Sequence, residues 1–221
     1  MKKPISINTV RRLPRYLRKL DELNKNDVFR ISSYQLGEML GLTPSQIRQD
    51  LSAFGGFGQQ GYGYSVPLLR NEIAMILGMN RGYTAILVGV GNIGRALIDK
   101  FQFNDWGLKL VCAFDVDQTI IGTTKNGIPV LDANSMEEYL REHSVDIAVL
   151  CVSKDRAVAA AKQITDCGIE AIWNFTNVDI VEPYSQTIVE NIHFSDSLLS
   201  LSFYLSERRD RANKNKEDVS L

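Results

Sequence analysis

A glycine-rich turn in the middle of the chain constrains the fold more than any other feature. The apolar run "YTAILVG" leads into Gly89, Gly91 and Gly94, which have the spacing G-x-G-x-x-G and precede a helical pattern. In such a motif the first glycine permits a tight turn, the second lets the backbone approach a pyrophosphate, and the third lets helix and strand pack closely. The helix N-terminus would present free N–H groups to the phosphates. The segment therefore predicts the start of a Rossmann-like, dinucleotide-binding domain.

The strand that follows predicts which dinucleotide is bound. The apolar run "LKLVCAF" ends at Asp115, where a carboxylate would accept hydrogen bonds from an adenosine ribose, and Asp117 is a less well placed alternative. Such a carboxylate repels a 2′-phosphate, and no Arg or Lys follows Asp115 closely in the sequence. The pattern therefore favours NAD(H) over NADP(H).

Helical and strand patterns then alternate. Helices are expected at "SMEEYLREH" and "DRAVAAAKQITDCG", and strands at "VDIAVLCVS", "EAIWNF" and "TIVENIHF". This order predicts a parallel sheet with helices on both faces.

The chain is expected to end in a helix from Ser195 to about Arg208. The remaining tail, "DRANKNKEDVSL", is expected to be frayed. The apolar side of this last helix would include Leu198, Leu201, Tyr204 and Leu205.

The residues in front of the glycine-rich turn predict a separate basic domain. Residues 1–82 contain twelve Lys or Arg and six Asp or Glu, a charge of +6, whereas the remainder has thirteen and twenty, a charge of -7. Opposite signs favour two domains, the first of which faces a polyanion. The first helical pattern is basic and contains Pro14, so this helix either kinks at the proline or starts nearby.

The segment "SSYQLGEMLGLTPSQIRQDLSAFG" has the pattern of two short helices about a tight turn. Ser32 or Ser33 would cap the first helix, and Thr43 would cap the second, with Pro44 as its first residue. The inward residues would be Leu36, Met39 and Leu40 in the first helix, and Ile47, Leu51 and Phe54 in the second.

The second of these helices would expose Arg, Gln and Ser side chains. Arg and Gln can pair bidentately with guanine and adenine edges in the major groove, so the pair of helices predicts a helix-turn-helix. The glycine-rich run "GGFGQQGYGYSVPLL" suits a β-hairpin with Gln59 and Gln60 at its tip, and such a wing can enter the minor groove. Together these segments predict a DNA-binding winged helix.

Several functions are less well supported. Only twenty-seven residues follow Phe194, too few for the substrate domain of a dehydrogenase, and His193 is the one credible catalytic candidate. Regulation by the nucleotide is then the simplest reason for one chain to contain both a nucleotide-binding domain and a DNA-binding domain. We therefore expect that the protein is not an enzyme. Cys112, Cys151 and Cys167 form no C-x-x-C pair and no metal spacing, so no metal site is expected. Cys112 and Cys151 lie inside apolar runs and are expected to be buried, with a thiol redox switch as the alternative.

No apolar run reaches the length of about 20 residues that a membrane span needs. The basic N-terminus has no continuous apolar core like that of a secretory signal. A cytoplasmic protein without a membrane partner is therefore expected.

Nearly the whole chain resembles the redox-sensing transcriptional repressor family Rex. The resemblance lies in "RRLPRYLRKL", "SSYQLGEMLGLTPSQIRQDLSAFGGFGQQGYGY", "LVGVGNIGRAL", "AFDVD", "WNFTNV" and "LSLSFYL". It implies a homodimer that binds palindromic operator DNA when NADH is scarce and releases it when NADH binds, with NAD+ in the same pocket. It also implies that the C-terminal helix is swapped between subunits.

The resemblance assigns three segments and two sets of residues. The segments are a winged helix-turn-helix domain at 1–80, a Rossmann-like NAD(H)-binding domain at 81–194 and a dimer-swapping helix and tail at 195–221. The DNA-binding residues would be Arg12, Arg15, Tyr16, Ser45, Gln46, Arg48, Gln49, Ser52, Gln59, Gln60, Gly61 and Tyr62. The nucleotide-binding residues would be Gly89, Gly91, Asn92, Ile93, Gly94, Asp115, Asn174, Phe175, Thr176 and Phe194.

The chain departs from the family pattern at the recognition surface and near its last helix. Many relatives have basic residues in place of Gln49, Gln59 and Gln60, so phosphate affinity here would lean on the N-terminal arginines. Relatives often carry an aspartate in place of His193, paired across the dimer with an arginine that matches Arg18. An imidazole cannot form that ion pair, so the sequence leaves open how the DNA-free state is latched.

Two other functions remain as alternatives. One is an NAD-dependent oxidoreductase with a DNA-binding arm, which would make His193 catalytic. The other is a CoA-binding module, because related small α/β domains use a similar glycine-rich turn; Asp115 argues against it.

Overall fold

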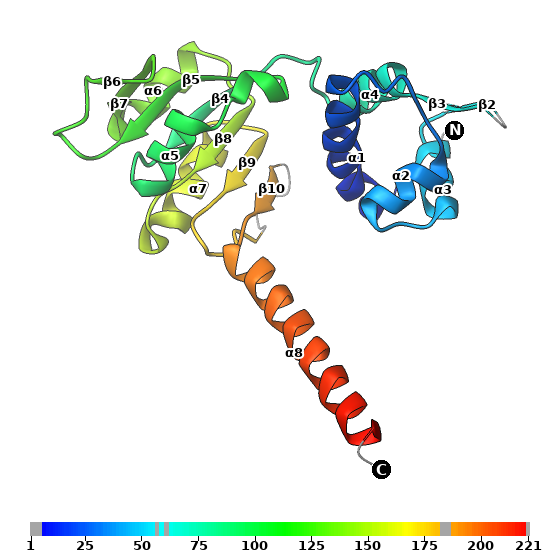
Figure 1. Ribbon diagram of the computed structural model, residues 1–221. Helices are drawn as coiled ribbons and strands as arrows, with labels where there is room; N and C mark the ends of the chain where they lie inside the picture. The colour runs from blue at the N-terminus through cyan, green and yellow to red at the C-terminus, as the bar shows by residue number, and fades with distance from the viewer. Residues whose placement is uncertain (1–5, 56–57, 60–61, 182–186, 220–221) are drawn as a thin grey trace. The chain divides into compact units, whose positions relative to one another are not determined.

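The computed structural model describes residues 6–55, 58–59, 62–181 and 187–219, and divides into two compact units, 1–82 and 83–221 (Figure 1). The boundary falls two residues after the expected one. Each unit is described by itself.

The first helix of the first unit is α1, Ile7–Lys25. Its N-cap is Ser6, whose hydroxyl accepts a hydrogen bond from the backbone N–H of Thr9. The helix begins well before Pro14, so the proline lies inside the helix and does not start it.

The helix-turn-helix has the caps that the sequence predicts. Ser32 caps α2, Ser33–Leu40, in a complete capping box, and Thr43 caps α3, Pro44–Ser52, which begins with the proline. The short strands β1 (Arg30–Ile31), β2 (Gly58–Gln59) and β3 (Gly63–Ser65) form an antiparallel sheet in the order β1-β3-β2. The winged helix-turn-helix is therefore confirmed.

Two predictions for the first unit were wrong. Met39 is 50% exposed, because the neighbouring Gly37 packs instead: a Cβ on this glycine would lie 2.5 Å from the backbone oxygen of Leu42. The run "VPLL" does not belong to the hairpin but starts a further helix, α4, Val66–Ile76, which packs on α1. The shared core includes Leu13, Leu17, Leu20, Leu36, Ile47, Leu51, Leu69 and Ile73.

The second unit is built on a sheet with the strand order β10-β9-β8-β4-β5-β7-β6. All neighbouring strands are parallel except β6 and β7, which the sequence patterns did not predict and which are antiparallel to each other. The bounds are β4 Tyr83–Val88, β5 Leu108–Asp115, β6 Thr124–Lys125, β7 Ile128–Asp132, β8 Ile147–Leu150, β9 Ala171–Asn174 and β10 Ile188–Asn191.

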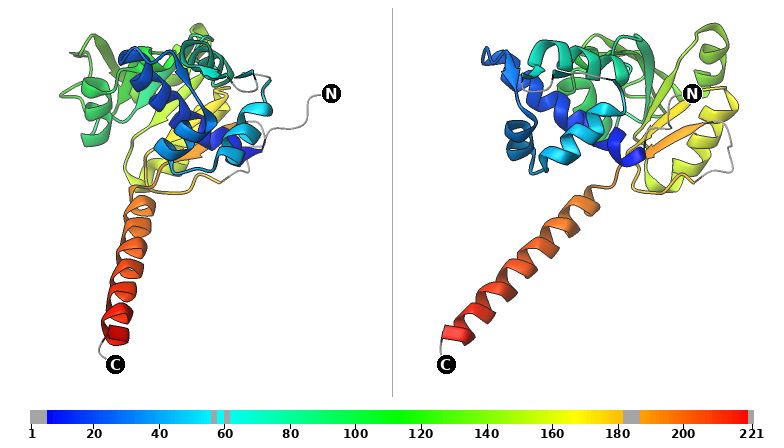
Figure 2. Two further views of the ribbon diagram at one scale, coloured as in Figure 1. Left: turned by 45° about the vertical axis from the view of Figure 1, so that its right-hand side comes forward. Right: turned by 90° about the vertical axis from the view of Figure 1, so that its right-hand side faces the viewer.

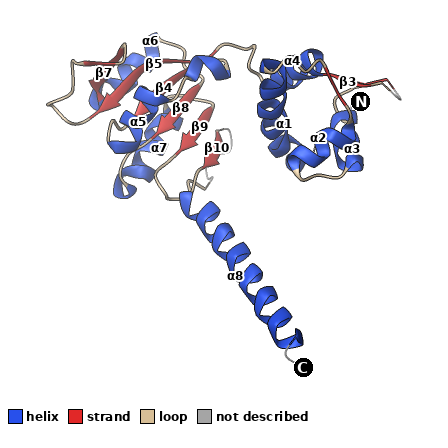
Figure 3. Cartoon of the chain, viewed as in Figure 1, coloured by secondary structure: helices blue, strands red, loops and turns tan. Residues whose placement is uncertain are grey.

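Helices cover both faces of this sheet (Figure 3). Alternate residues of β4 enter two separate cores, Ile86 on one face and Ala85 and Leu87 on the other, as the two-residue period of a strand requires. The predicted Rossmann-like parallel α/β domain is confirmed. Its helices are α5 Asn92–Lys100, α6 Met136–Glu142 and α7 Ala157–Asp166, with 3-10 turns at Phe103–Trp106, Ala133–Ser135 and Lys154–Arg156.

The last helix, α8, runs from Phe194 to Val219 (Figure 2). It starts one residue before the expected Ser195. The predicted frayed tail is wrong as far as Val219, since the helix continues through this polar segment. Its large apolar side chains are exposed, among them Leu198, Leu199, Leu201, Phe203, Tyr204 and Leu205.

Candidate functional site

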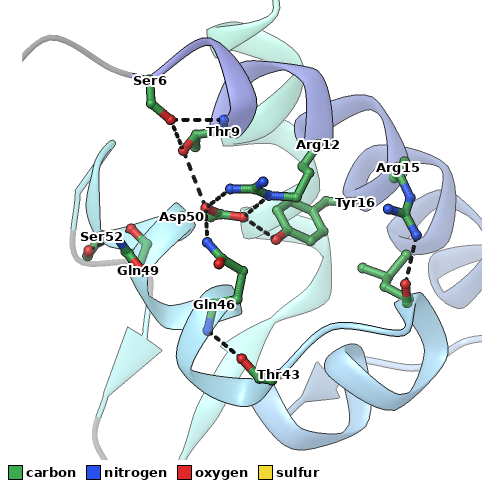
Figure 4. A network of polar contacts seen from close by, with 11 residues as sticks. Ser6, Thr9, Arg12, Arg15, Tyr16, Thr43, Gln46, Gln49, Asp50 and Ser52 are labelled. Atoms are coloured by element: carbon green, nitrogen blue, oxygen red, sulfur yellow. Dashed lines mark hydrogen bonds and ion pairs between the residues drawn. The ribbon is translucent and has the colours of Figure 1, made fainter.

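A buried carboxylate joins α1 to α3 in the first unit (Figure 4). Asp50 of α3 is 1% exposed, and its two oxygens accept hydrogen bonds from Arg12 Nε and Nη2, both at 2.7 Å. The hydroxyl of Tyr16 donates at 2.5 Å, Gln46 Nε2 at 2.9 Å and the hydroxyl of Thr9 at 3.3 Å. The Asp50 side chain thus fixes the orientation of α3 against the basic helix α1.

The network keeps Asp50 ionised. Burial by itself would raise the pKa of this carboxyl, but the hydrogen bonds from Arg12, Tyr16 and Gln46 outweigh it and hold the pKa below its ordinary value. Burial and the bond to Asp50 raise the pKa of Tyr16, and the same carboxylate raises the pKa of Arg12. The ion pair is therefore complete at neutral pH.

The network revises two residues predicted to contact DNA. Tyr16 is fully buried and its hydroxyl is engaged by Asp50, so we move it from the phosphate-binding set to the support of α3. Gln46 is half-buried and also holds Asp50. Arg12 stays partly exposed, and Arg15 is exposed where it donates to the backbone oxygen of Leu40 at 2.7 Å.

The outer side of α3 presents the remaining predicted base-reading residues. Ser45, Arg48, Gln49 and Ser52 are all exposed. Arg48 Nη1 donates to the hydroxyl of Ser33 at 3.1 Å, so its guanidinium is held against the start of α2. The arrangement offers planar hydrogen-bonding groups from one short helix, as base recognition in a major groove requires.

The wing contains a residue that the sequence patterns missed. The guanidinium of Arg30 in β1 lies 5.7 Å from the ring centroid of Tyr62 and donates to its backbone oxygen at 3.2 Å. Tyr62 is 69% exposed. The sequence signal that could have identified Arg30 is a basic residue in β1, the strand that pairs with the hairpin strand β3. Of the predicted wing tip, Gln60 and Gly61 lie outside the described residues, and Gln59 is described only as backbone in β2.

The glycine-rich turn has the geometry that the motif requires. Gly89 has a φ of 98°, and a Cβ there would lie 2.8 Å from the backbone of Cys151; a Cβ on Gly94 would lie 2.1 Å from the Gly89 oxygen. Gly91 is different, because a Cβ there would meet nothing within 4 Å. It is the N-cap of α5 and supplies no side chain to the first turn, which includes Asn92. This leaves room at a helix N-terminus for an anionic group.

Asp115 lies at the end of β5 and ties that strand to the glycine-rich turn. One carboxylate oxygen accepts from Val90 N at 2.5 Å, and the other accepts from Val116 N at 2.7 Å and Asp117 N at 2.9 Å. The hydroxyl and backbone N–H of Thr119 lower the pKa of Asp117.

A positive charge does lie near Asp117 in the folded chain, although no Arg or Lys follows Asp115 closely in the sequence. Arg95, on α5, also contributes to the lowered pKa of Asp117. The expectation from the sequence that no cation lies near this acidic segment therefore does not hold in the folded chain.

The segment after β9 is tightly bonded within the chain. Asn174 is buried; its Nδ2 donates to Val178 O and to Asn191 Oδ1, both at 2.7 Å, and its Oδ1 accepts from Thr176 N and Oγ1. The side chains of Asn174 and Thr176 therefore shape the turn through hydrogen bonds within the chain. Phe175 is buried, with its ring 6.4 Å from that of the exposed Phe194.

These segments meet at one edge of the sheet. The glycine-rich turn, Asp115, Cys151 and Asn174 stand at the carboxyl ends of the parallel strands β4, β5, β8 and β9. The chain leaves β4 toward β5 on one side, while β8 pairs on the other, and open α/β sheets bind ligands at this kind of switch point.

The three thiols are poorly suited to a redox switch. Burial raises the pKa of Cys112 to about 11 and that of Cys151 to about 12, and it also raises the pKa of Cys167. A thiol that stays protonated is a weak nucleophile. Among the described residues, no cluster of His, Cys, Asp and Glu could hold a metal ion, and no helix has the length and apolar character to cross a membrane.

Comparison with known proteins places both units in one family. The Redox-sensing transcriptional repressor Rex of Clostridium beijerinckii is 48% identical over 93% of this chain and 97% of its own length. The chain belongs to the Rex family. The Rex of Caldanaerobacter subterraneus subsp. tengcongensis is 45% identical over 92% of this chain and 90% of its own.

Solved structures and family models agree with the Rex assignment. The crystal structure of RSP in complex with beta-NAD+ and operator DNA is 43% identical, covers 98% of this chain and 99% of its own, and matches with a TM-score of 0.87. RSP in complex with beta-NADH is 40% identical over 96% and 99%, with the same TM-score. Family models described as "Putative DNA-binding protein N-terminus" and "CoA binding domain" match residues 4–52 and 80–178.

Proposed function

We propose that this Rex chain represses transcription by binding palindromic operator DNA as a homodimer, and releases the operator when its Rossmann-like domain takes up NADH. The observation that carries the proposal is the union in one chain of a braced recognition helix and a glycine-rich turn at the switch point of a parallel sheet. RSP, whose structure matches along the whole chain, binds operator DNA and both forms of the dinucleotide.

The DNA contacts of α1 and α3 are assigned by exposure, and those of the wing are assigned from the sequence pattern. Arg48 and Gln49 read base edges, while Ser45 and Ser52 flank them on the same helix. The phosphate contacts come from Arg12, Arg15 and the wing, Gln59, Gln60, Gly61 and Tyr62. Asp50 supports this surface from behind, because it fixes Arg12 and Gln46 together.

The nucleotide contacts are assigned to the carboxyl edge of the sheet. Gly91 and the first turn of α5, with Asn92 and Ile93, face the pyrophosphate, and Gly89 and Gly94 permit the close packing behind it. Asp115 accepts from the adenosine ribose. The nicotinamide end of NADH or NAD+ lies toward the 174–176 segment and Phe194.

The first part of α8 supports a swapped dimer. Phe194–Leu205 carries exposed apolar side chains on two sides of the helix at about 100° per residue, with Leu199 and Phe203 opposite Leu201 and Leu205. Apolar side chains on two opposite sides of one helix are covered only when other elements enclose the helix. The partner subunit supplies that enclosure in the proposed dimer.

The preference for NADH follows from the same enclosure. The oxidised nicotinamide ring is positively charged, and burial of an unpaired charge beside the apolar Phe175 and Phe194 is costly. A ligand that binds both states of the dimer equally shifts nothing, so NAD+ leaves the operator bound. Because linkage is reciprocal, operator DNA weakens NADH binding by the same factor by which NADH weakens DNA binding.

The proposal includes no enzymatic activity. Both ring nitrogens of His193, the earlier catalytic candidate, face Asn177 and Asp179 within the chain. CoA remains the alternative that the second family model suggests, but the carboxylate of Asp115 suits a ribose diol better than a phosphorylated ribose. A repressor of this kind works beside the chromosome, in the cytoplasm.

Fluorescence anisotropy of a labelled palindromic operator tests the proposal. The protein–DNA complex is titrated at fixed salt with NADH, NAD+ or CoA, because phosphate contacts make the affinity fall steeply with ionic strength. Release by NADH alone supports the proposal. Release by CoA, or binding that ignores every nucleotide, contradicts it.

A further inference from the structure

His193 lies between the last strand of the sheet and the first residue of α8. Its Nε2 is 2.9 Å from Asp179 Oδ1, and its Nδ1 is 3.1 Å from Asn177 Oδ1. Both partners belong to the turn that follows β9, and the imidazole is mostly buried between them. Residues 174–180, which contain this turn, are called the β9 turn below.

The β9 turn is also attached to the end of β10 by an asparagine. Asn191 Oδ1 accepts from Asn174 Nδ2 at 2.7 Å and from Ile180 N at 3.2 Å. Asn177 has a φ of 59°, a left-handed conformation, at the point where it meets the imidazole. The turn therefore has one defined shape, and two side chains beyond it hold that shape.

The contacts of Asn191 and His193 with the β9 turn differ in whether they link the turn to α8. Asn191 is still paired in the sheet, opposite Asn174, so the sheet alone keeps it beside the turn. His193 is past the last paired residue, and Phe194 already belongs to α8. The imidazole is thus the polar side chain that carries the attachment from the sheet to the helix.

Little else in the described part of this chain restrains α8. The apolar side chains that follow, such as Leu198 and Leu201, are exposed, and Phe194 is itself 63% exposed where it faces Phe175. The direction in which α8 leaves the sheet is therefore set near its first residue.

We propose that His193 is a positioning residue that clamps the start of α8 to the β9 turn through Asp179 and Asn177. The inference rests on the proposed function, and it adds the route by which the nucleotide site acts on the helix. A change in the β9 turn when the nicotinamide pocket fills is passed to α8 through the imidazole. Without the clamp the nucleotide still binds, but α8 no longer follows the turn.

The experiment separates nucleotide binding from operator release in the full-length protein. His193→Gln and Asp179→Asn are compared with the wild type, with the double variant and with Glu190→Gln. Glu190 is an exposed carboxylate of β10, so this control removes one negative charge close to the clamp. Three quantities are measured: operator affinity without nucleotide, NADH affinity without DNA, and the NADH concentration that releases half of the operator.

The clamp predicts a change in the third quantity alone. Both clamp variants are expected to need roughly ten-fold more NADH for half-release, within the range of typical allosteric couplings. The double variant is expected to be no worse than either single one, because both remove the same contact. Operator affinity and NADH affinity are expected to stay at wild-type values, and Glu190→Gln is expected to behave as the wild type.

Three outcomes overturn the inference. Half-release at the wild-type NADH concentration would show that the imidazole transmits nothing, and a matching loss of NADH affinity would place His193 in the binding pocket. Additive losses in the double variant would show two independent effects. Asp179→Asn keeps the test valid if His193→Gln unfolds, since Asp179 is largely exposed. Failure of the wild type to release DNA would instead refute the proposed function.

Discussion

Helices α3 and α8 use their side chains in opposite ways. The short α3 buries Ile47 and Leu51 within its own unit, and its buried carboxylate, Asp50, has all its partners in the same chain. The much longer α8 leaves residues such as Leu201 and Phe203 exposed. The side chains that orient α3 are therefore supplied within one chain, whereas the apolar side chains of α8 have a partner only in the proposed dimer.

This difference separates two properties of the repressor. Which bases are read depends on side chains that a single chain already orients. In the proposed dimer, whether the operator stays bound depends on the spacing of two recognition helices, about 34 Å for successive major grooves. Changes in α1 and α3 should therefore alter the stability of the first unit and its affinity for the operator. Changes in α8 should alter dimerisation and the response of operator binding to NADH.

The largest effect is expected for Asp50→Ala. The change leaves Arg12 and the buried Tyr16 hydroxyl without their acceptor, and each buried polar group left unsatisfied costs about 1–3 kcal/mol, with more for a charged group. Trp106 and Trp173 both lie in the second unit, so tryptophan fluorescence reports that unit alone. We expect the far-UV circular dichroism transition in urea to move to lower denaturant while the fluorescence transition stays.

Glu38→Ala is the matched control, because Glu38 is an exposed acidic residue of the same unit. Equal transitions for the two variants would mean that the Asp50 network does not brace α1 against α3.

Dimerisation is expected to respond next, to Leu201→Glu. An enclosed leucine contributes roughly 1.5–3 kcal/mol, so the charged replacement should weaken self-association by at least about ten-fold. Analytical ultracentrifugation measures this, with Arg209→Glu in the polar half of α8 as the control. A Leu201→Glu protein that dimerises like the wild type would mean that α8 is not covered by a second copy.

Acid should remove the contribution of Asp50 gradually. Its pKa is lower in the folded chain than the value of about 3.9 of an unfolded aspartate, so its stabilisation is complete above that value and is lost as the pH falls through the folded pKa. The stability advantage of the wild type over Asp50→Asn should therefore shrink below about pH 4. Thermal unfolding of both proteins between pH 3 and 7 checks this, and a constant difference would contradict it.

The smallest effect is expected at the wing. Arg30→Lys keeps the charge but loses the planar group over Tyr62, a contact worth about 0.5–1 kcal/mol at an exposed site, so operator affinity should fall about two- to five-fold. Arg81→Lys, at another exposed arginine of the first unit, is the control. Arg30→Lys with wild-type affinity, and Arg30→Ala with a reduced salt slope, would make Arg30 a simple phosphate contact.

Short-range signals predicted much of this molecule. Thr43 and Pro44 start α3 because a cap and a first-turn proline act within one helical turn. Gly94 is fixed by the close approach of the Gly89 backbone five residues earlier, and the strand leading to Asp115 is fixed by its apolar run. Such features depend on residues near them in the sequence.

Features that depend on distant partners could not be read in the same way. Asp50 looks like one more polar residue of a short helix, and its partners Arg12 and Tyr16 lie more than thirty residues away. The exposure of Met39 follows from the approach of Leu42 to Gly37, which helical spacing does not reveal. The internal bonding of Asn174 depends on Asn191, whose place is fixed only by the strand order.

Hydrogen exchange across α8 in the operator-bound protein tests the central claim most directly. The account predicts slow exchange in Phe194–Leu205, because a second copy encloses this segment, and a change in protection at its start and in residues 174–180 after NADH but not after NAD+. Fast exchange throughout Phe194–Leu205, or the same protection with and without NADH, would contradict the claim that α8 is completed by a partner and follows the nucleotide.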